Sequence, residues 1–409
     1  MKKRVVITGL GPVTQLGIGK DSFVENLIKG NFDFIKKIPS SVKKEYELTT
    51  SFYVPAVTLP SNIIDRKIRL FSNYNSQIAV LASKLAIEDS GIAIPETNEI
   101  PVILGQGIGD LGSSFKNFEN HISGKRMDRF AAPKIMSNAP SAWISIVNKL
   151  YGENQIVNAA CASSTNAVGE SFRKIADGYA SIVICGGTEC LQDNKFTTMK
   201  ILEGLGVFDN SKNGQPKPFH HSRSGMLMNE GAACCLVLEE YEHAKSRKAH
   251  IYAEITGFES AMDAHSIVAI DESGLIIEKM LRKLIGENNV DYYNAHGTGT
   301  VLNDKVESTV FKKIFGENIK KQPIINSTKG ILGHTFGASG AIEAMICALS
   351  IDQGIIHANT IENMIEDPID NLNLAKKLIK NQEINRAVSA SFGFGGHDSA
   401  LVFERVNNE

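Results

Sequence analysis

The stretch QIVNAACASSTNAVGESFRKIA at residues 155–176 predicts a strand, a tight turn and a buried helix in immediate succession. Residues 155–160 have the character of a short buried strand, and Cys161 follows it directly. Residues 162–176 have helical spacing, and the small side chains near their start let the helix pack deeply. A strand followed at once by a buried helix is typical of a layered α/β protein.

The alternation of strands and helices continues on both sides of this stretch. In the first part of the chain we expect strands at 5–9, 101–106, 181–185 and 233–238, and helices at 21–29 and 73–90. The first strand is expected to end in a turn at Gly9. After a charged stretch at 239–248, further strands are expected at 251–258, 290–294, 323–326, 387–394 and 399–403, with helices at 276–285, 304–315 and 338–350. This pattern predicts mainly parallel sheets covered by helices, in two similar halves at residues 1–250 and 251–409.

Composition narrows the class of protein. The 409 residues carry 43 basic and 45 acidic side chains, so no basic excess points to nucleic acid as a main partner. No segment reaches the roughly 18–20 apolar residues of a membrane span. The apolar part of residues 1–9 is too short for a signal peptide, and Gly9 and Gly11 interrupt it. We therefore expect a cytoplasmic protein without a membrane span.

The six cysteines have no C-x-x-C spacing, which disfavours a zinc or redox site. Five of them are expected to be small core residues, and disulfides are disfavoured in a reducing compartment. Cys161 differs because it begins a helix, where the positive end of the dipole favours a thiolate. It is a candidate nucleophile, although this motif alone also fits a buried structural cysteine.

Three further glycine-rich motifs follow expected strands. NAHGTGT at 294–300 holds His296 in a turn, with Thr298 and Thr300 after it. STKGILGHTFGASG at 327–340 places Lys329 and His334 on a loop before a helix that bears Glu343. SFGFGGHDSALVF at 391–403 surrounds Phe394 with glycines, so that its backbone N–H groups can approach a ligand and supply an oxyanion-hole donor. Two histidines and a cysteine in the same setting point to catalysis.

Together these motifs resemble the β-ketoacyl synthases, nearest to the type II enzymes that depend on acyl carrier protein. The resemblance runs almost end to end, including RVVITGLGPVTQLG at 4–17 and PKPFHHSRSGMLMNEGAACCLVLEE at 216–240. It implies an α/β thiolase-like fold whose two similar halves form a layered α-β-α-β-α arrangement. It also implies an acyltransferase that condenses an acyl group on Cys161 with a malonyl unit, with loss of carbon dioxide and with no metal or organic cofactor.

The resemblance implies a role for each motif residue. Cys161 is the nucleophile, and His296 and His334 stabilise the enolate formed from the malonyl group. Lys329, near Glu343, is implied to order the second histidine region, and Phe394 to complete the oxyanion hole. Thr298 and Thr300 are implied to hold the pantetheine arm, and Ile108 to line the acyl pocket. Arg66, Lys67 and Arg69 are implied to dock the carrier protein. The implied partners are acyl- and malonyl-loaded acyl carrier proteins and a second ketosynthase subunit, in a homodimer or a heterodimer.

One glycine motif also fits a different function. GIGDLG at 107–112 follows an expected strand and matches a dinucleotide-binding loop. No acidic residue ends a second strand about 20 residues further on, as such a site needs. We therefore interpret these glycines as part of a pocket wall beside the acyl chain.

Departures from the family pattern leave the pathway open. His397 and Asp398 follow GFGG where fatty acid synthases usually carry Thr-Asn, and HGTGTVLND replaces the commoner HGTST with a following proline. Both features look closer to specialised enzymes, so fatty acid, polyketide and aryl polyene pathways all remain. Two other functions also remain: a noncatalytic chain-length partner, which usually lacks the cysteine, and a thiolase dependent on coenzyme A, which carries a second cysteine where this chain has GFGGHDS.

Overall fold

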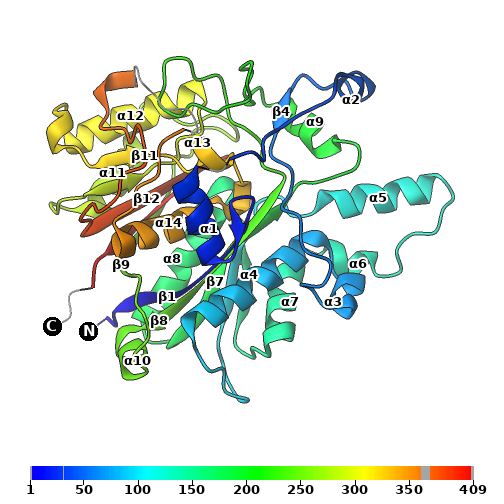
Figure 1. Ribbon diagram of the computed structural model, residues 1–409, viewed down its shortest axis with the longest axis horizontal. Helices are drawn as coiled ribbons and strands as arrows, with labels where there is room; N and C mark the ends of the chain where they lie inside the picture. Colours follow the sequence, from blue (N-terminus) through cyan, green and yellow to red (C-terminus); the bar gives the residue numbers. More distant parts are fainter. Residues whose placement is uncertain (1, 31, 361–368, 407–409) are drawn as a thin grey trace.

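A single mixed sheet runs through the computed structural model, which describes residues 2–30, 32–360 and 369–406 (Figure 1). The strand order is β11-β10-β12-β13-β9-β1-β8-β7-β5-β6. The first five strands of this order along the chain are β1 (Val5–Thr14), β5 (Val102–Gly105), β6 (Asn154–Val157), β7 (Ile182–Cys190) and β8 (Gly231–Glu240), and β2 pairs with β1 beside this order. The second five are β9 (Ala253–Met262), β10 (Tyr292–Asn294), β11 (Ile324–Asn326), β12 (Arg386–Gly393) and β13 (His397–Glu404).

The two halves of the sheet repeat one topology. β5 pairs in parallel with β6 and β7, and β10 pairs in parallel with β11 and β12. The other neighbours, β7–β8–β1 and β12–β13–β9, are antiparallel, and an antiparallel β1–β9 pair joins the halves. The expectation of mainly parallel sheets was wrong. One reason is the short turn between β12 and β13, because parallel neighbours need a long crossover.

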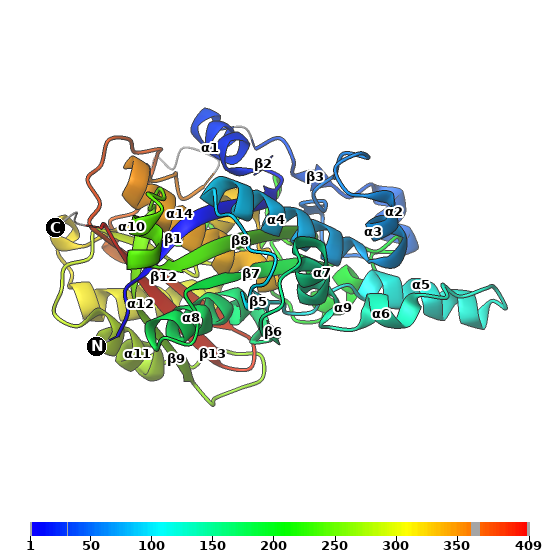
Figure 2. The same cartoon turned by 90° about the horizontal axis from the view of Figure 1, so that it is seen from below.

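Helices complete five layers. α8 (Ser163–Ala176) and α14 (Ser339–Gln353) lie between the two half-sheets and touch strands of both. α4 (Tyr74–Ser90) and α7 (Ala139–Asn148) cover the outer face of the first half-sheet, and α11 (Leu275–Ile285) and α12 (Val301–Phe315) lie outside the second (Figures 1 and 2). This is the expected α-β-α-β-α arrangement, with two similar halves in a thiolase-like fold.

Two glycines of β1 serve packing instead of a turn. β1 continues through Gly9 to Thr14, whereas the sequence predicted that it would end at Gly9. A Cβ on Gly9 would lie 2.1 Å from the Ala86 carbonyl oxygen, and one on Gly11 would lie 2.0 Å from that of Ala82. The glycines therefore let α4 lie directly on the strand.

Shorter elements decorate this core. α5 (Leu111–Ile122) and α6 (Ala131–Ile135) project from one end of the molecule in both views (Figures 1 and 2). No helix in the described part of the chain is long and apolar enough to cross a membrane. The remaining elements are β2 (Gly17–Ile18), α1 (Lys20–Lys29), β3 (Lys36–Lys37), α2 (Ser40–Glu45), β4 (Phe52–Tyr53), α3 (Arg66–Phe71), α9 (Thr197–Glu203), α10 (Tyr241–Ser246), α13 (Lys329–Leu332) and the 3₁₀ turns η1 (Ala160–Ala162), η2 (Ile319–Lys321), η3 (Phe336–Ala338) and η4 (Ile369–Asn371).

Candidate active site

Cys161 lies in η1, at the junction between β6 and α8. The residue before it, Ala160, has a φ of 48°, in the left-handed region that L-residues rarely adopt. Phe336 has the same φ in η3, which leads into α14. The two halves thus share one strained turn before a buried helix, and only the first half places a cysteine after it. Such strain is characteristic of functional sites.

Burial dominates the ionisation of Cys161. The residue is 5% exposed, and burial raises the pKa of its thiol to about 11. The Lys329 ammonium and the backbone N–H of Phe394 act in the opposite direction. The expectation of a lowered pKa at the start of α8 was therefore wrong for the free protein, because removing water from a thiolate outweighs these favourable contacts.

The tautomer of His334 is set by the backbone. The N–H of Phe336 donates to Nδ1 of His334 at 3.0 Å, and the Ser339 hydroxyl lies 3.2 Å from the same nitrogen. Burial and the nearby Lys329 hold the pKa of His334 well below its usual value. A neutral ring whose Nδ1 accepts a hydrogen bond carries its proton on Nε2. His334 is therefore a hydrogen-bond donor through Nε2.

His296 is held by a carboxylate on α12. Glu307 accepts the backbone N–H groups of His296 and Gly297, each at 2.8 Å, and so fixes the turn after β10. The His296 ring lies edge-on to that of His334, with 5.7 Å between ring centroids, and packs against Phe392. Burial lowers the pKa of His296 well below its usual value, and Lys329 and His334 add to this shift. Both imidazoles are therefore neutral at neutral pH.

A buried ion pair supports the two histidines. The ammonium of Lys329 lies 2.5 Å from Oε1 of Glu343, and these residues are 2% and 1% exposed. Burial raises the pKa of Glu343 and the Lys329 charge opposes this. The same positive charge disfavours protonation of both imidazoles. Lys329 thus helps to keep both imidazoles neutral, the form that can donate a hydrogen bond without carrying a positive charge.

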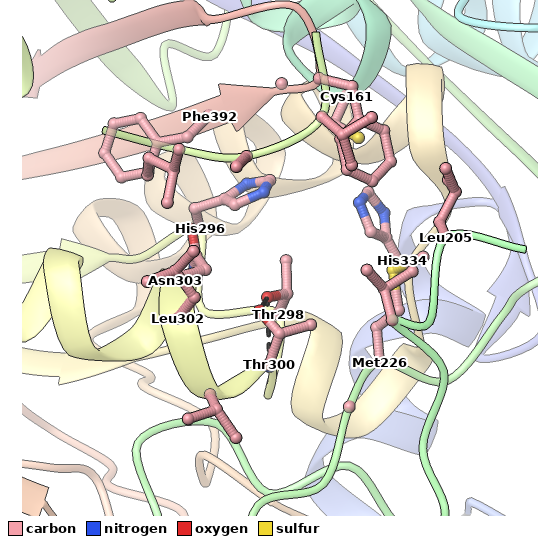
Figure 3. Close-up of a pocket in the computed structure, with 18 of the residues that line it drawn as sticks. Cys161, Leu205, Met226, His296, Thr298, Thr300, Leu302, Asn303, His334 and Phe392 are labelled. Atoms are coloured by element: carbon pink, nitrogen blue, oxygen red, sulfur yellow. Dashed lines mark hydrogen bonds between the residues drawn. The ribbon is translucent and has the colours of Figure 1, made fainter. Parts of the chain in front are cut away.

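One cavity of about 390 Å³ gathers six of the predicted site residues, on elements from both halves. Figure 3 shows Cys161, His296 and His334 facing this space, with Thr298 and Thr300 further along it. The hydroxyls of the two threonines are 2.9 Å apart. Phe394 also lines the cavity, as do Phe392 and apolar side chains such as Leu205, Met226 and Leu302. A mostly apolar cleft with a few converging polar groups is typical of a substrate site.

The turn between β12 and β13 brings a second N–H group to Cys161. The backbone N–H of Phe394 interacts with the Cys161 thiol. A Cβ on Gly393 would lie 3.2 Å from the Cys161 backbone nitrogen and 2.8 Å from the Ala159 carbonyl oxygen. Glycine at 393 therefore leaves space beside the Cys161 N–H. Backbone N–H groups beside a nucleophile can bind a developing oxyanion.

The GIGDLG stretch binds a carboxylate of the protein itself. Glu189 on β7 accepts the N–H groups of Gly107, Ile108, Gly109 and Gly337, and it is fully buried. These amides are occupied, which argues further against a dinucleotide phosphate at this loop. The structure does not bring Ile108 to the cavity, because its side chain is 37% exposed and lies outside the cavity lining of this chain. Sequence reasoning missed Glu189 and Glu307; an acidic residue in the apolar run of β7 was the available signal for the first.

The three cations expected at a docking surface lie on α3. Arg66, Lys67 and Arg69 are all exposed, and Asp65 caps the helix by accepting the N–H of Lys67 at 2.7 Å. The helix is short and separate from α4, which begins at Tyr74. None of the three side chains lines the cavity. Their position fits contact with a partner and not with the reacting groups.

Comparison with known proteins gives one consistent result along the chain. Residues 2–244 match the model of the beta-ketoacyl synthase N-terminal domain, and residues 252–361 match that of the C-terminal domain. The 3-oxoacyl-[acyl-carrier-protein] synthase 2 of Coxiella burnetii is 34% identical over 427 residues, which cover 99% of both chains. The Staphylococcus aureus protein of the same name is 32% identical over 414 residues, covering 98% of both.

Solved structures agree with the sequence matches. A beta-ketoacyl synthase from Burkholderia phymatum superposes with a TM-score of 0.86 at 29% identity, covering 99% of this chain and 100% of that one. The ishigamide ketosynthase/chain length factor gives 0.87 at 25% identity and covers all of both chains. A ketosynthase solved with its type II polyketide acyl carrier protein also gives 0.87, over 99% and 100% of the two chains; at 23% identity it shows the shared fold.

Proposed function

Because the chain belongs to the β-ketoacyl synthase family, we propose that it is a β-ketoacyl-[acyl carrier protein] synthase, an acyltransferase that joins an acyl group to a malonyl unit. The observation that carries this proposal is the convergence of Cys161, His296 and His334 on one cavity. A buried thiol beside two neutral imidazoles and two N–H groups has the parts that acyl transfer and enolate formation require.

In the first half-reaction, the sulfur of Cys161 attacks the thioester carbonyl of an acyl carrier protein. Negative charge grows on the carbonyl oxygen, and the N–H groups of Cys161 and Phe394 stabilise it. The carbon–sulfur bond to the pantetheine arm then breaks. Because the pKa of Cys161 is about 11, it begins as a thiol, and its proton ends on the departing pantetheine sulfur.

In the second half-reaction, a malonyl thioester occupies the emptied cavity. His296 and His334 donate hydrogen bonds to its thioester oxygen, and the bond to the carboxylate breaks with release of carbon dioxide. The electron pair of that bond forms an enolate, whose carbon attacks the acyl group on Cys161. The Cys161 sulfur leaves as a thiolate and takes a proton from water, and the product is a 3-oxoacyl thioester two carbons longer.

Substrate delivery extends this proposal to the rest of the surface. Thr298 and Thr300 line the outer part of the cavity, where their hydroxyls can bond the amides of a pantetheine arm. Arg66, Lys67 and Arg69 on α3 offer cations to an acidic carrier protein. The six free cysteine thiols fit a reducing compartment, so we keep the cytoplasm as the proposed location.

We also propose that the chain pairs with a copy of itself or with a related subunit. The projecting α5–α6 region exposes apolar side chains, including Phe118, Ile122 and Met136. Such a patch on a projecting segment marks a protein interface. The ishigamide structure contains a ketosynthase with a chain length factor, which illustrates the second arrangement. A subunit across this surface could also cover Ile108, which is part of the proposed acyl pocket.

Two other functions fit less well. A noncatalytic chain-length partner does not need a nucleophile, yet Cys161 lies in the cavity with both histidines. A thiolase needs a second cysteine near the C-terminal motif, and the turn after β12 carries Phe394 and glycines instead. Cys347, the last cysteine of the chain, is buried within α14 and does not line the cavity.

Intact-mass analysis tests the proposal directly. The protein is incubated with a panel of acyl carrier proteins of different chain lengths, and then with malonyl-loaded carrier protein. We expect one acyl mass on the wild-type chain, none on Cys161→Ala, and a 3-oxoacyl product only with wild type. Elongation by Cys161→Ala near the wild-type rate would refute the nucleophile, and acylation from coenzyme A thioesters alone would favour a thiolase.

A further inference from the structure

A buried carboxyl lies beside the turn that carries Phe394. Asp398 is the second residue of β13, directly after that turn. Its side chain lines the catalytic cavity together with Asp263 and Phe392, although the residue is only 2% exposed. Within the described residues, Oδ2 of Asp398 has no hydrogen-bond partner. The catalytic steps proposed above leave this carboxyl without a role.

A loop of the second half is tethered to the same turn. The N–H of Asp263 donates to the Gly396 carbonyl at 2.9 Å, and that of Gly395 donates to the Ile267 carbonyl at 2.9 Å. The Asp263 carboxylate accepts the backbone N–H groups of His265 and Asp271, at 3.0 and 3.1 Å, and so organises the loop. A Cβ on Gly396 would lie 2.2 Å from Oδ1 of Asp263, which places this carboxylate against the turn.

Two carboxylates, those of Asp263 and Asp271, act on Asp398. Strands β9 and β12 place the uncharged Ala261 and Phe392 opposite it. The surrounding elements contribute further titratable groups. These are Asp263, His265 and Asp271 from the loop, His397 at the start of β13, Cys161 from η1, His296 after β10, His334, the paired Lys329 and Glu343, the half-buried Glu278 and the exposed Lys279, Arg282 and Lys283 of α11. Burial, with smaller contributions from the carboxylates of Asp263 and Asp271, raises the pKa of Asp398 to about 8.

We propose that Asp398 is a positioning residue: its buried carboxyl, beside the 263–271 loop, keeps that loop on the turn that holds the Phe394 N–H beside Cys161. This inference rests on the proposed condensing activity. An ionised Asp398 would add a buried negative charge that repels the carboxylates of Asp263 and Asp271. The repulsion would loosen the tethers at Gly395 and Gly396 and displace one of the two oxyanion donors.

The test compares Asp398→Asn with wild type across pH. Asparagine has the same shape and is neutral at every pH. The rate measured is single-turnover transfer of an acyl group from carrier protein to Cys161, by intact mass, from about pH 6 to about pH 9. We expect the ratio of wild-type to variant rate to be constant below about pH 7 and to fall about tenfold per pH unit above about pH 8. Glu272→Gln is the control, because it removes an exposed charge next to Asp271 in the sequence. The ratio of wild-type to Glu272→Gln rate should stay constant over the same pH range.

Thermal unfolding gives an independent reading of the same proton. The carboxyl of an unfolded aspartate ionises near pH 3.9, whereas Asp398 in the folded chain keeps its proton up to about pH 8. Raising the pH between these values therefore favours the unfolded wild-type chain, and the Tm advantage of Asp398→Asn should grow across that window.

The outcomes separate the two proposals. A constant wild-type to Asp398→Asn rate ratio up to pH 9, with an active wild type, would refute the positioning role and leave the condensing activity intact. A Tm difference that does not change with pH would show that Asp398 is ionised throughout, which also refutes it. A wild-type protein that acquires no acyl group at any pH would instead overturn the proposed function, and the role of Asp398 with it.

Discussion

At the scale of single residues, the reacting groups share one property: all are uncharged in the free protein. Burial raises the pKa of Cys161 and lowers those of His296 and His334. Lys329 adds to the lowering at both histidines and opposes the effect of burial at Cys161. A neutral imidazole can donate a hydrogen bond to a forming enolate without first giving its proton away. In the proposed mechanism, acyl transfer therefore depends on Cys161 and on the N–H groups of Cys161 and Phe394, whereas decarboxylation depends on the two histidines.

That division predicts different effects in the two half-reactions. His296→Ala and His334→Ala should each slow decarboxylation of malonyl carrier protein by about 10²–10³-fold, since each removes one donor to the enolate oxygen. Acylation of Cys161 in the same variants should change much less. Release of labelled carbon dioxide measures the first reaction, and intact mass measures the second. Variants that decarboxylate normally but acquire no acyl group would contradict the assignment.

At the scale of secondary structure, buried carboxylates fix the loops that carry the chemistry. Glu307 on α12 binds the turn of His296, and Glu189 on β7 binds the loop after β5 together with Gly337 of η3. Each carboxylate satisfies backbone N–H groups that their loops leave without strand or helix partners. The glycines of these loops are needed because the backbone must come this close to a side chain.

Glu189→Ala should therefore destabilise the fold strongly. It leaves four N–H groups without their acceptor, those of Gly109 and Gly337 buried and those of Gly107 and Ile108 partly buried. A buried N–H group without an acceptor costs about 1–3 kcal/mol. We expect a loss of at least about 3 kcal/mol in the free energy of unfolding, measured by urea denaturation. Glu189→Gln is the matched control, because its amide oxygen keeps one acceptor and should recover part of the loss. Equal stability of wild type and Glu189→Ala would show that water replaces the carboxylate.

At the scale of the whole molecule, the cavity exists only where the two halves meet. The first half contributes Cys161, and the second contributes both histidines and the turn with Phe394. α8 and α14 begin at this junction, so the layer between the half-sheets also positions the nucleophile and the second histidine. In the proposed function, the carrier protein delivers its arm from the surface to a site deep between the halves.

Reversing the charges of Arg66, Lys67 and Arg69 should raise KM for carrier-protein substrates and leave kcat largely intact. Exposed charges add little to folding, but they steer an oppositely charged partner. The wild-type advantage should fade with salt, since the Debye length falls from about 10 Å at 0.1 M to about 3 Å at 1 M.

Small acyl-pantetheine mimics should be turned over equally by wild type and by this charge-reversed variant. Reversal of Lys2, Lys3 and Lys245, at the N-terminus and on α10 at the opposite end of the views in Figures 1 and 2, is the control of equal charge. An equal loss with mimics and carrier proteins, without salt dependence, would assign the three cations to folding.

The sequence by itself determined most of the elements and identified the candidate reacting residues. The helices expected at 73–90 and 276–285 are α4 and α11, and the strand expected at 387–394 is β12, because periodicity and strand propensity are local properties. The motifs around Cys161, His296 and His334 could be identified because each is a short continuous run. Their assignment to catalysis came from the family resemblance and stays a prediction.

Only the tertiary structure decided how these parts act on one another. It showed that Gly9 and Gly11 let α4 pack directly on β1 and that the sheet is mixed. It also showed that Glu189 accepts the N–H of Gly337 and that Ile108 lies outside the cavity. It also reversed the expected pKa shift of Cys161 and set the tautomer of His334. Each of these depends on burial or on contacts between residues far apart in the chain. The local sequence pattern cannot predict burial or these long-range contacts, because they arise only when the two halves pack around the cavity.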